Sequence, residues 1–251
     1  MDLGITGRIA VVTGGSEGIG LAAAHILAEE GANVVILART QSKLDAAVAE
    51  ISSTAVGEIE AISCDVSDQD SVTAAFDRIL DKWGKVDILV NNAGTGNANS
   101  FDDLTNELLS GDLQLKVFGA VYCSRAALPS MRENKWGRII NITGKSEPDG
   151  INGAFCAKAA MHSWAKGMSR EVGKHGITVN CIPPGRIISE QILRNYSPEY
   201  REWQSENEIP VGEYGQPEDI ANLVCYLVSP LARYITGTVI PVDGGLRRYQ
   251  F

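Results

Sequence analysis

The chain has 251 residues, with 22 Lys and Arg against 31 Asp and Glu, so its formal net charge at pH 7 is −9. Hydrophobic residues make up 44% of the chain, which is typical of a globular protein and too apolar for a disordered one. The acidic balance argues against the basic surface that nucleic-acid and anionic-membrane binders use. We therefore expect neither kind of partner.

The five cysteines are widely spaced, and no C-x-x-C pair occurs among them. This pattern is typical of reduced thiols in a cytoplasmic protein rather than of a disulfide framework or a zinc site. The three histidines are far apart, so we expect no metal site. The chain also lacks a signal-peptide pattern and an apolar stretch of about 18 residues, so we expect a cytoplasmic location.

Short apolar runs alternate with helical patterns along the whole chain. The runs predict strands at residues 8–13, 33–37, 59–63, 86–90, 138–142, 178–182 and 238–242. The patterns between them predict helices at residues 21–30, 41–52, 71–83, 108–131 and 157–174. Because the runs do not alternate in polarity, their strands are expected to be parallel and covered on both faces.

This order of elements predicts an α/β fold. It is a single domain over residues 1–251, with a doubly wound Rossmann-type parallel sheet of about seven strands. Residues 188–217 are polar, with Tyr196, Tyr200 and Trp203 among them. They follow a strand's carboxyl end, so we expect them to form a lid over a ligand crevice.

Residues 13–20, TGGSEGIG, follow the first predicted strand and open the first helix. The three glycines at positions 14, 18 and 20 would allow a sharp turn, a close approach of backbone to a pyrophosphate, and tight packing of helix on sheet. The start of the helix would offer free N–H groups to phosphates. We therefore predict a dinucleotide cofactor here, contacted by Gly14, Ser16, Glu17, Gly18, Ile19 and Gly20.

The end of the second predicted strand bears on the choice of cofactor. A carboxylate there binds the ribose 2′-hydroxyl of NAD(H), whereas an arginine accommodates the 2′-phosphate of NADP(H). The sequence has no carboxylate at this position, and Arg39 follows the strand. This favours NADP(H) over NAD(H), although Glu17 in the glycine turn counts against the extra phosphate.

Further segments resemble the short-chain dehydrogenase/reductase family over essentially the whole chain. Residues 13–20 resemble its T-G-x-x-x-G-x-G loop, residues 64–66 its adenine-contacting segment, and residues 91–94 its N-N-A-G motif. Residues 184–189 resemble its P-G-x-x-x-T segment, and residues 243–245 match its D-G-G. The resemblance implies further cofactor contacts at Asp65, Val66, Asn92, Ala93, Gly94, Lys158, Pro184, Gly185, Ile187 and Ser189.

The same resemblance exposes departures at the active site, where the family uses Asn, Ser, Tyr and Lys. The corresponding positions here are Lys116, Gly144, Ala154 and Lys158, so only the lysine matches. Reduction of a carbonyl group still requires an oriented oxygen and a proton source. We expect these from Lys158, Lys116, Thr143 and Ser146, acting on a small-molecule substrate.

Three functions remain open at this point. The first is an NADP(H)-dependent oxidoreductase for a carbonyl or alcohol substrate with a non-standard proton donor. The second is a non-redox enzyme of the lyase or addition type that uses a desolvated lysine. The third is a catalytically inactive NADP(H)-binding protein. The resemblance also implies a homo-oligomer, a dimer or a tetramer, paired through helices near residues 108–131 and 157–174.

Overall fold

The computed structural model describes residues 2–94, 100–144 and 153–247. Within these residues a six-stranded parallel sheet has the order β3-β2-β1-β4-β5-β6. Its strands are β1 (Ile9–Thr13), β2 (Asn33–Ala38), β3 (Ile59–Ser63), β4 (Ile88–Asn91), β5 (Gly137–Ile142) and β6 (Ile177–Ile182). The strand order reverses between β1 and β4, as in a doubly wound sheet, and this confirms the predicted fold class.

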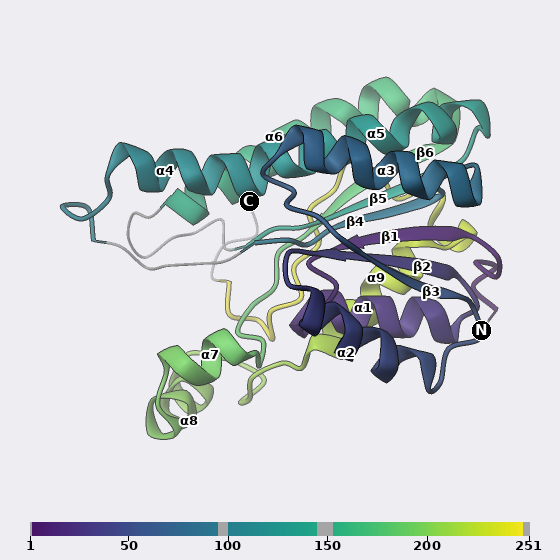
Figure 1. Cartoon of the computed structure of the whole chain (residues 1–251). Coiled ribbons are helices and arrows are strands. Elements are labelled where there is room, and N and C mark those ends of the chain that lie inside the picture. The colour runs from purple at the N-terminus through teal and green to yellow at the C-terminus, as the bar shows by residue number, and fades with distance from the viewer. Residues whose placement is uncertain (1, 95–99, 145–152, 248–251) are drawn as a thin grey trace.

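Helices cover both faces of the sheet (Figure 1). One layer contains α1 (Gly18–Glu29), α2 (Gln41–Ser52) and α9 (Pro217–Val228), and the other contains α3 (Gln69–Trp83), α5 (Gly119–Glu133) and α6 (Gly153–Val172). Successive strand residues face opposite layers, so Val12 and Ile36 pack under the first layer and Val11 and Val35 under the second. The strands are therefore apolar on both faces, as the continuous apolar runs predicted.

The seventh predicted strand, residues 238–242, lies beside β6 without extending the sheet as a regular strand. It runs parallel to the neighbouring chain and joins it through isolated bridges at Val239 and Val242. Pro183, Pro184 and Pro241 in the two segments lack an N–H. A regular ladder is interrupted for this reason, since each proline removes a donor.

The long helix predicted at residues 108–131 is helical throughout but changes its winding. It comprises α4 (Asn106–Leu113), a π-helical turn η1 (Gln114–Phe118) and α5. The Gln114 side chain donates a 2.7 Å hydrogen bond to the backbone oxygen of Ser67, which anchors the turn to the segment between β3 and α3. Single π turns occur often at functional sites, and this one contains Lys116.

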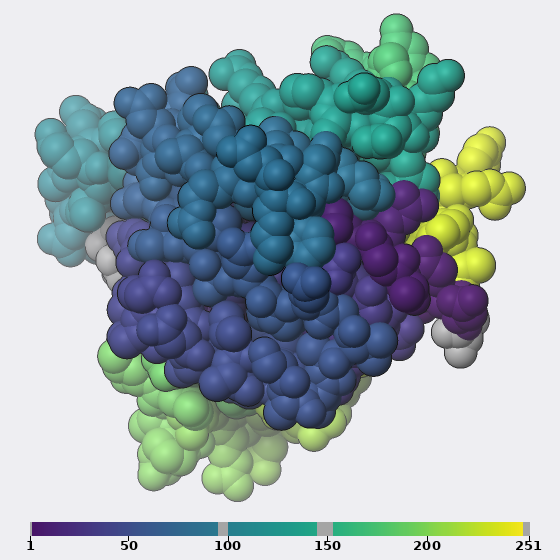
Figure 2. All heavy atoms as spheres, turned by 45° about the vertical axis from the view of Figure 1, so that its right-hand side comes forward, coloured from purple at the N-terminus to yellow at the C-terminus, as the bar shows by residue number. Residues whose placement is uncertain are grey.

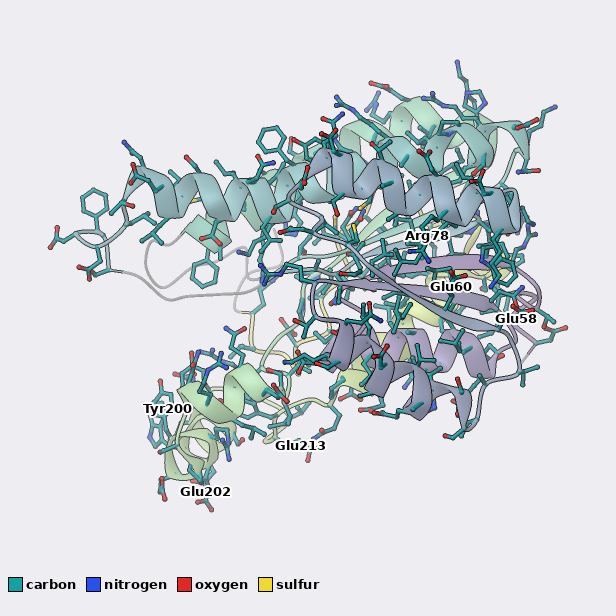
Figure 3. All side chains as sticks on the ribbon, viewed as in Figure 1. Glu58, Glu60, Arg78, Tyr200, Glu202 and Glu213 are labelled. Atoms are coloured by element: carbon teal, nitrogen blue, oxygen red, sulfur yellow. The ribbon has the colours of Figure 1, made fainter. Side chains whose placement is uncertain are left out.

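The predicted lid, residues 188–217, contains α7 (Glu190–Asn195) and α8 (Pro198–Asn207). These helices project from the sheet at its carboxyl end, and in the space-filling view they lie at the lower edge of the molecule (Figures 1 and 2). Tyr200 is on the outer side of this projection (Figure 3). The rings of Tyr196, Tyr200 and Trp203 stack on one another there, and Tyr200 and Trp203 remain exposed.

Two short 3-10 turns, η2 (Gly173–His175) and η3 (Pro230–Ala232), complete the described elements. The edge strand β3 carries charge, since Glu60 pairs with Arg78 and Lys82 of α3 (Figure 3). Charged side chains on an edge strand discourage pairing with another sheet. In the described part of the chain, no helix is long and apolar enough to cross a membrane.

Candidate functional site

Two adjoining cavities lie at the carboxyl ends of the strands. The outer cavity, of about 500 Å³, extends from the glycine turn and the tip of β2 toward α7. The inner cavity, of about 180 Å³, lies between the tips of β4 and β5, η1 and α6. Residues that line both cavities include Ile19, Val66, Asn92, Ala93 and Gly94, so the two form one continuous space.

The glycine turn between β1 and α1 forms one wall of the outer cavity. Gly14 and Gly18 have positive φ angles of 63° and 56°, which favour glycine. A Cβ on Gly20 would lie 2.2 Å from the Gly14 carbonyl oxygen, whereas one on Gly18 would meet no atom within 4 Å. Gly20 therefore permits close packing beneath the turn, and Gly18 leaves the backbone open toward the cavity.

Asn92 holds this turn in place. Its side-chain amide donates 3.1 Å hydrogen bonds to the carbonyl oxygens of Thr13 and Gly14. The Thr13 hydroxyl in turn accepts from the backbone N–H groups of Asn92 and Ala93. The predicted residues of the N-N-A-G segment thus fasten the tip of β1 to the tip of β4, beside the shared part of the cavities.

A small charged cluster lies at the tip of β2. Arg39 lines the outer cavity there, together with Lys43, Glu17 and the exposed carboxylate of Glu190 from α7. Lys43 pairs with Glu17, and the hydrogen bond between them raises the pKa of Lys43 above its usual value. The sequence analysis did not identify Lys43. Its position four residues after Arg39, in the helix that follows β2, nevertheless indicates that it lies near the tip of that strand. The positive charge of Lys43 offsets the negative charge of Glu17, which argued against NADP(H) in the sequence analysis.

Asp65 and Val66 lie along the outer cavity, as predicted. The Asp65 carboxylate accepts hydrogen bonds from the backbone N–H and the hydroxyl of Ser67, at 2.9 and 2.6 Å. The bond from the Ser67 hydroxyl holds the pKa of Asp65 below its usual value. The carboxylate is therefore fixed in orientation and ionised near neutral pH.

The predicted segment at residues 184–189 reaches the cavities only in part. Pro184 lines the inner cavity, and Ser189 lines the outer cavity while its hydroxyl caps α7. Gly185 packs against the backbone of Asp243, and Ile187 is buried in the core at 7% exposure. Neither of these two residues is among the described residues that line the cavities.

The inner cavity brings two lysines together. Lys116 is buried, and its ammonium pairs with the carboxylate of Asp112 one turn earlier. Lys158 comes from α6 and is partly buried. Burial and, to a smaller extent, the charge of Lys116 lower the pKa of Lys158, whereas Asp112 raises it, and the net value is about 8. A cation with this pKa exchanges a proton near neutral pH.

Gly144 lies directly against Lys158. A Cβ at position 144 would be 2.5 Å from Cδ and 2.8 Å from Nζ of Lys158. The lysine thus occupies the space that any larger residue at position 144 needs. Ala154, at the start of α6, is buried at 4% exposure and likewise brings no hydroxyl to the site.

Thr143 lines the inner cavity at 2% exposure. Its hydroxyl lies 2.7 Å from Nε2 of His162, which is one turn beyond Lys158 on α6. Burial lowers the pKa of His162, and the charge of Arg247 adds to this effect, so the ring is neutral at pH 7. Sequence reasoning set His162 aside because it has no nearby partner in the chain. The predicted residue Ser146 lies outside the described residues.

Asp112 is a second residue that sequence reasoning missed. The signal was present, since Asp112 and Lys116 are four residues apart in a predicted helix and can therefore form an ion pair. Among the described residues, no group of three or more His, Cys, Asp or Glu side chains is arranged to hold a metal ion.

Comparison with known proteins places the chain among oxidoreductases. Residues 11–247 match the family described as enoyl-(acyl carrier protein) reductase. A curated relative, 2,3-dihydroxy-2,3-dihydro-p-cumate dehydrogenase of Pseudomonas putida, is 34% identical, with 97% of this chain and 95% of the relative covered.

Two solved structures are similar over nearly the full chain. L-sorbose reductase from Gluconobacter frateurii, complexed with NADPH and L-sorbose, has a TM-score of 0.94 and 31% identity, covering 99% of this chain and 100% of its own. A short-chain oxidoreductase from Pseudomonas aeruginosa PAO1, bound to NADPH and described as containing an atypical catalytic center, has a TM-score of 0.90 and 35% identity. That similarity covers 96% of this chain and 97% of the Pseudomonas aeruginosa protein.

Proposed function

The chain belongs to the short-chain dehydrogenase/reductase family, and on this basis we propose that it is an NADP(H)-dependent oxidoreductase that reduces a carbonyl group or oxidises an alcohol. The observation that carries the proposal is the continuous space from Arg39 to Lys158, with the glycine turn at its centre. Its proton donor is an amine rather than a phenol, since the inner cavity contains Lys116 and Lys158.

The residues along this space fit a dinucleotide. Arg39 and Asp65 line the end where an adenosine would lie, and the open backbone at Gly18 faces the middle, where phosphates would accept N–H hydrogen bonds. Lys158 lies in the inner cavity, where a nicotinamide ribose and a substrate would meet. When bound, the cofactor supplies or accepts the hydride.

The protein's own residues then orient the substrate and move the proton. The Thr143 hydroxyl is held by His162 and can orient the substrate oxygen. Lys158 donates a proton to that oxygen as the carbonyl is reduced, or accepts one as the alcohol is oxidised. A donor whose pKa is about 8 is matched to this task near neutral pH.

The preference for NADP(H) over NAD(H) is part of the proposal. Arg39 and Lys43 both line the outer cavity at the tip of β2, where a 2′-phosphate would lie. Lys43 is paired with Glu17, and it can turn to a phosphate because its ammonium is at the end of a flexible, exposed side chain. Two cations at this position favour the phosphorylated ribose.

The test is binding followed by hydride transfer. Fluorescence titration should give tighter binding of NADPH than of NADH to the purified protein. A panel of ketones, aldehydes and sugars, screened with NADPH carrying a deuteride, should then yield a deuterated alcohol for at least one compound. Tight NADPH binding without any transfer across the panel would instead support the catalytically inactive binding protein.

One observation favours a second candidate, the lysine-dependent enzyme. A partly buried amine with a pKa of about 8 is neutral often enough to attack a carbonyl and form a Schiff base. Borohydride should then trap substrate on Lys158 irreversibly, as mass spectrometry would show. Hydride transfer without such trapping assigns the lysine to proton transfer.

A further inference from the structure

We propose that Asp112 is a positioning residue for the reaction: its carboxylate holds Lys116 beside Lys158, and this arrangement makes Lys158 the amine that transfers the proton. The proposal deepens the proposed function and rests on it. Asp112 acts through the lysines and does not itself line the inner cavity among the described residues.

The geometry of the Asp112–Lys116 pair separates the roles of the two amines. The pair joins α4 to the π turn, and its side chains are only 16% and 5% exposed. Among the ion pairs of the described residues, Lys116 is engaged by Asp112, whereas Lys158 pairs with no carboxylate. Lys116 is thus a fixed charge, and Lys158 is the amine that can transfer its proton to a substrate.

Two glycines make room for this arrangement. A Cβ on Gly153, the first residue of α6, would lie 2.6 Å from Oδ2 of Asp112. Gly144 similarly leaves the space that the Lys158 side chain fills. Asp112 and Lys158 therefore occupy space that is open only because positions 153 and 144 are glycines. Both glycines adjoin the same site.

The charges around Lys158 predict the sign of each effect. Lys116, from η1, and Lys158, from α6, are the titratable side chains among the described residues that line the inner cavity, with Asp112 behind Lys116. His162, on α6, contacts Thr143 and is neutral at pH 7. Lys116 lowers the pKa of Lys158 and Asp112 raises it, so removing either charge shifts the pKa in the opposite direction.

As the hydride reaches the carbonyl carbon, an N–H bond of the Lys158 ammonium breaks and an O–H bond forms on the substrate. The products are the alcohol, the oxidised cofactor and a neutral amine, which regains a proton from solvent. For reduction, the rate therefore falls as pH rises through the pKa of Lys158.

The experiment measures the pKa of Lys158 without requiring a substrate. The protein is labelled briefly with acetic anhydride across a pH series, and mass spectrometry follows acetylation of Lys158, since only the neutral amine reacts. The midpoint should be near pH 8 in the wild-type protein. It should move down by about 1 pH unit in Asp112→Asn, because the amide oxygen still accepts a hydrogen bond from Lys116 but carries no negative charge. It should move up by a similar amount in Lys116→Met.

Further variants make the result specific. The double variant Asp112→Asn/Lys116→Met should bring the midpoint back toward pH 8, because the two charge changes cancel. Asp112→Glu should keep the wild-type midpoint, and Glu107→Gln, an exposed carboxylate on the same helix, should not move it. Thermal melting and NADPH binding show that each variant is folded.

Unchanged midpoints in both single variants would overturn the proposal, as would shifts of the same sign. If a substrate has been found, the pH profile of its reduction should shift with the labelling midpoint, and a fixed profile would also overturn it. Absence of turnover in every variant with shifted midpoints would instead count against the proposed function. The two failures are therefore distinguishable.

Discussion

Lys158 is a cation whose surroundings disfavour its charge. Burial and the nearby ammonium of Lys116 lower its pKa to about 8, whereas an unfolded chain leaves it near the ordinary value of 10.5. The unfolded chain therefore binds the proton more tightly, and this costs stability at every pH at which Lys158 is protonated in the unfolded chain. A buried lysine of this kind lowers the free energy of unfolding, as is typical of residues retained for function.

Replacement of Lys158 by Met should therefore stabilise the protein at neutral pH. The destabilising effect of the lysine is fully present below about pH 8 and disappears as pH rises toward 10.5. Thermal melting of both proteins between pH 6 and pH 10 should show a higher Tm for Lys158→Met at the acidic end and a closing gap above pH 8. A pH-independent gap would contradict this account.

Arg39 and Lys43 should discriminate between the two nicotinamide cofactors. A charge-assisted hydrogen bond to a 2′-phosphate contributes about 1.5–3 kcal/mol, so Arg39→Ala and Lys43→Ala should each weaken NADPH binding about 10-fold or more. NADH binding should change little, because NADH lacks the phosphate. Titration of both cofactors against each variant gives the comparison, with Lys174→Ala at an exposed position as control. Equal losses of affinity for NADH and NADPH would exclude phosphate recognition.

At the scale of elements, the glycine turn and α1 depend on close packing between β1 and α1. Gly20 has the Gly14 carbonyl oxygen and the Asn92 amide where a side chain would begin. Gly111, in α4, has no atom within 4 Å of that position. The same substitution at the two positions therefore separates a packing requirement from helix propensity.

Gly20→Ala should destabilise the protein by about 1–3 kcal/mol, because the turn must move to admit the methyl group, and NADPH binding should weaken with it. Gly111→Ala should stabilise the protein by up to about 1 kcal/mol, because alanine restricts the unfolded chain and favours the helix. Urea unfolding and cofactor titration of both variants test this pair. Similar stability changes at both positions would refute the packing argument.

At the scale of the whole molecule, α3 and α5 present a groove of about 270 Å³ on the second helical layer, with Phe76, Leu80 and Tyr122 in its lining. Phe118, the last residue of η1, is 47% exposed, and the centroid of its ring lies 6.3 Å from that of Tyr122. Asp77 and Arg125 also line the groove, so its surface is mixed. The exposed aromatic ring beside it is consistent with the predicted pairing between subunits through the helix at residues 108–131.

We expect light scattering to give a mass of two or four times 26.9 kDa. Phe118→Glu should reduce the mass toward that of a monomer, because it places a charge in the paired surface. Val56→Glu, at a site that is 73% exposed and far along the chain, should leave the mass unchanged. A monomeric wild-type protein would refute the predicted oligomer.

Much of the fold and the glycine turn of the site could be predicted from the sequence because they depend on local pattern. Continuous apolar runs specify buried parallel strands, and the glycines of residues 13–20 specify the turn that Asn92 then fastens. Elements whose shape depends on residues distant in the sequence could not be predicted in the same way. The seventh apolar run, residues 238–242, does not form a regular strand because prolines in it and in the segment after β6 interrupt the ladder. The π turn is held by a hydrogen bond from Gln114 to the distant Ser67.

The sequence by itself determined the family and predicted the cofactor frame, because these follow from residue type and order. It also predicted a lysine at the family's Asn position and no hydroxyl at its Ser and Tyr positions. Only the tertiary structure decided how Lys116 and Lys158 are arranged. Asp112 engages Lys116, Gly144 admits Lys158, and His162 meets Thr143 across separate elements. The pKa of Lys158 follows from burial and from the charges that folding brings near it, and neither can be read along the chain.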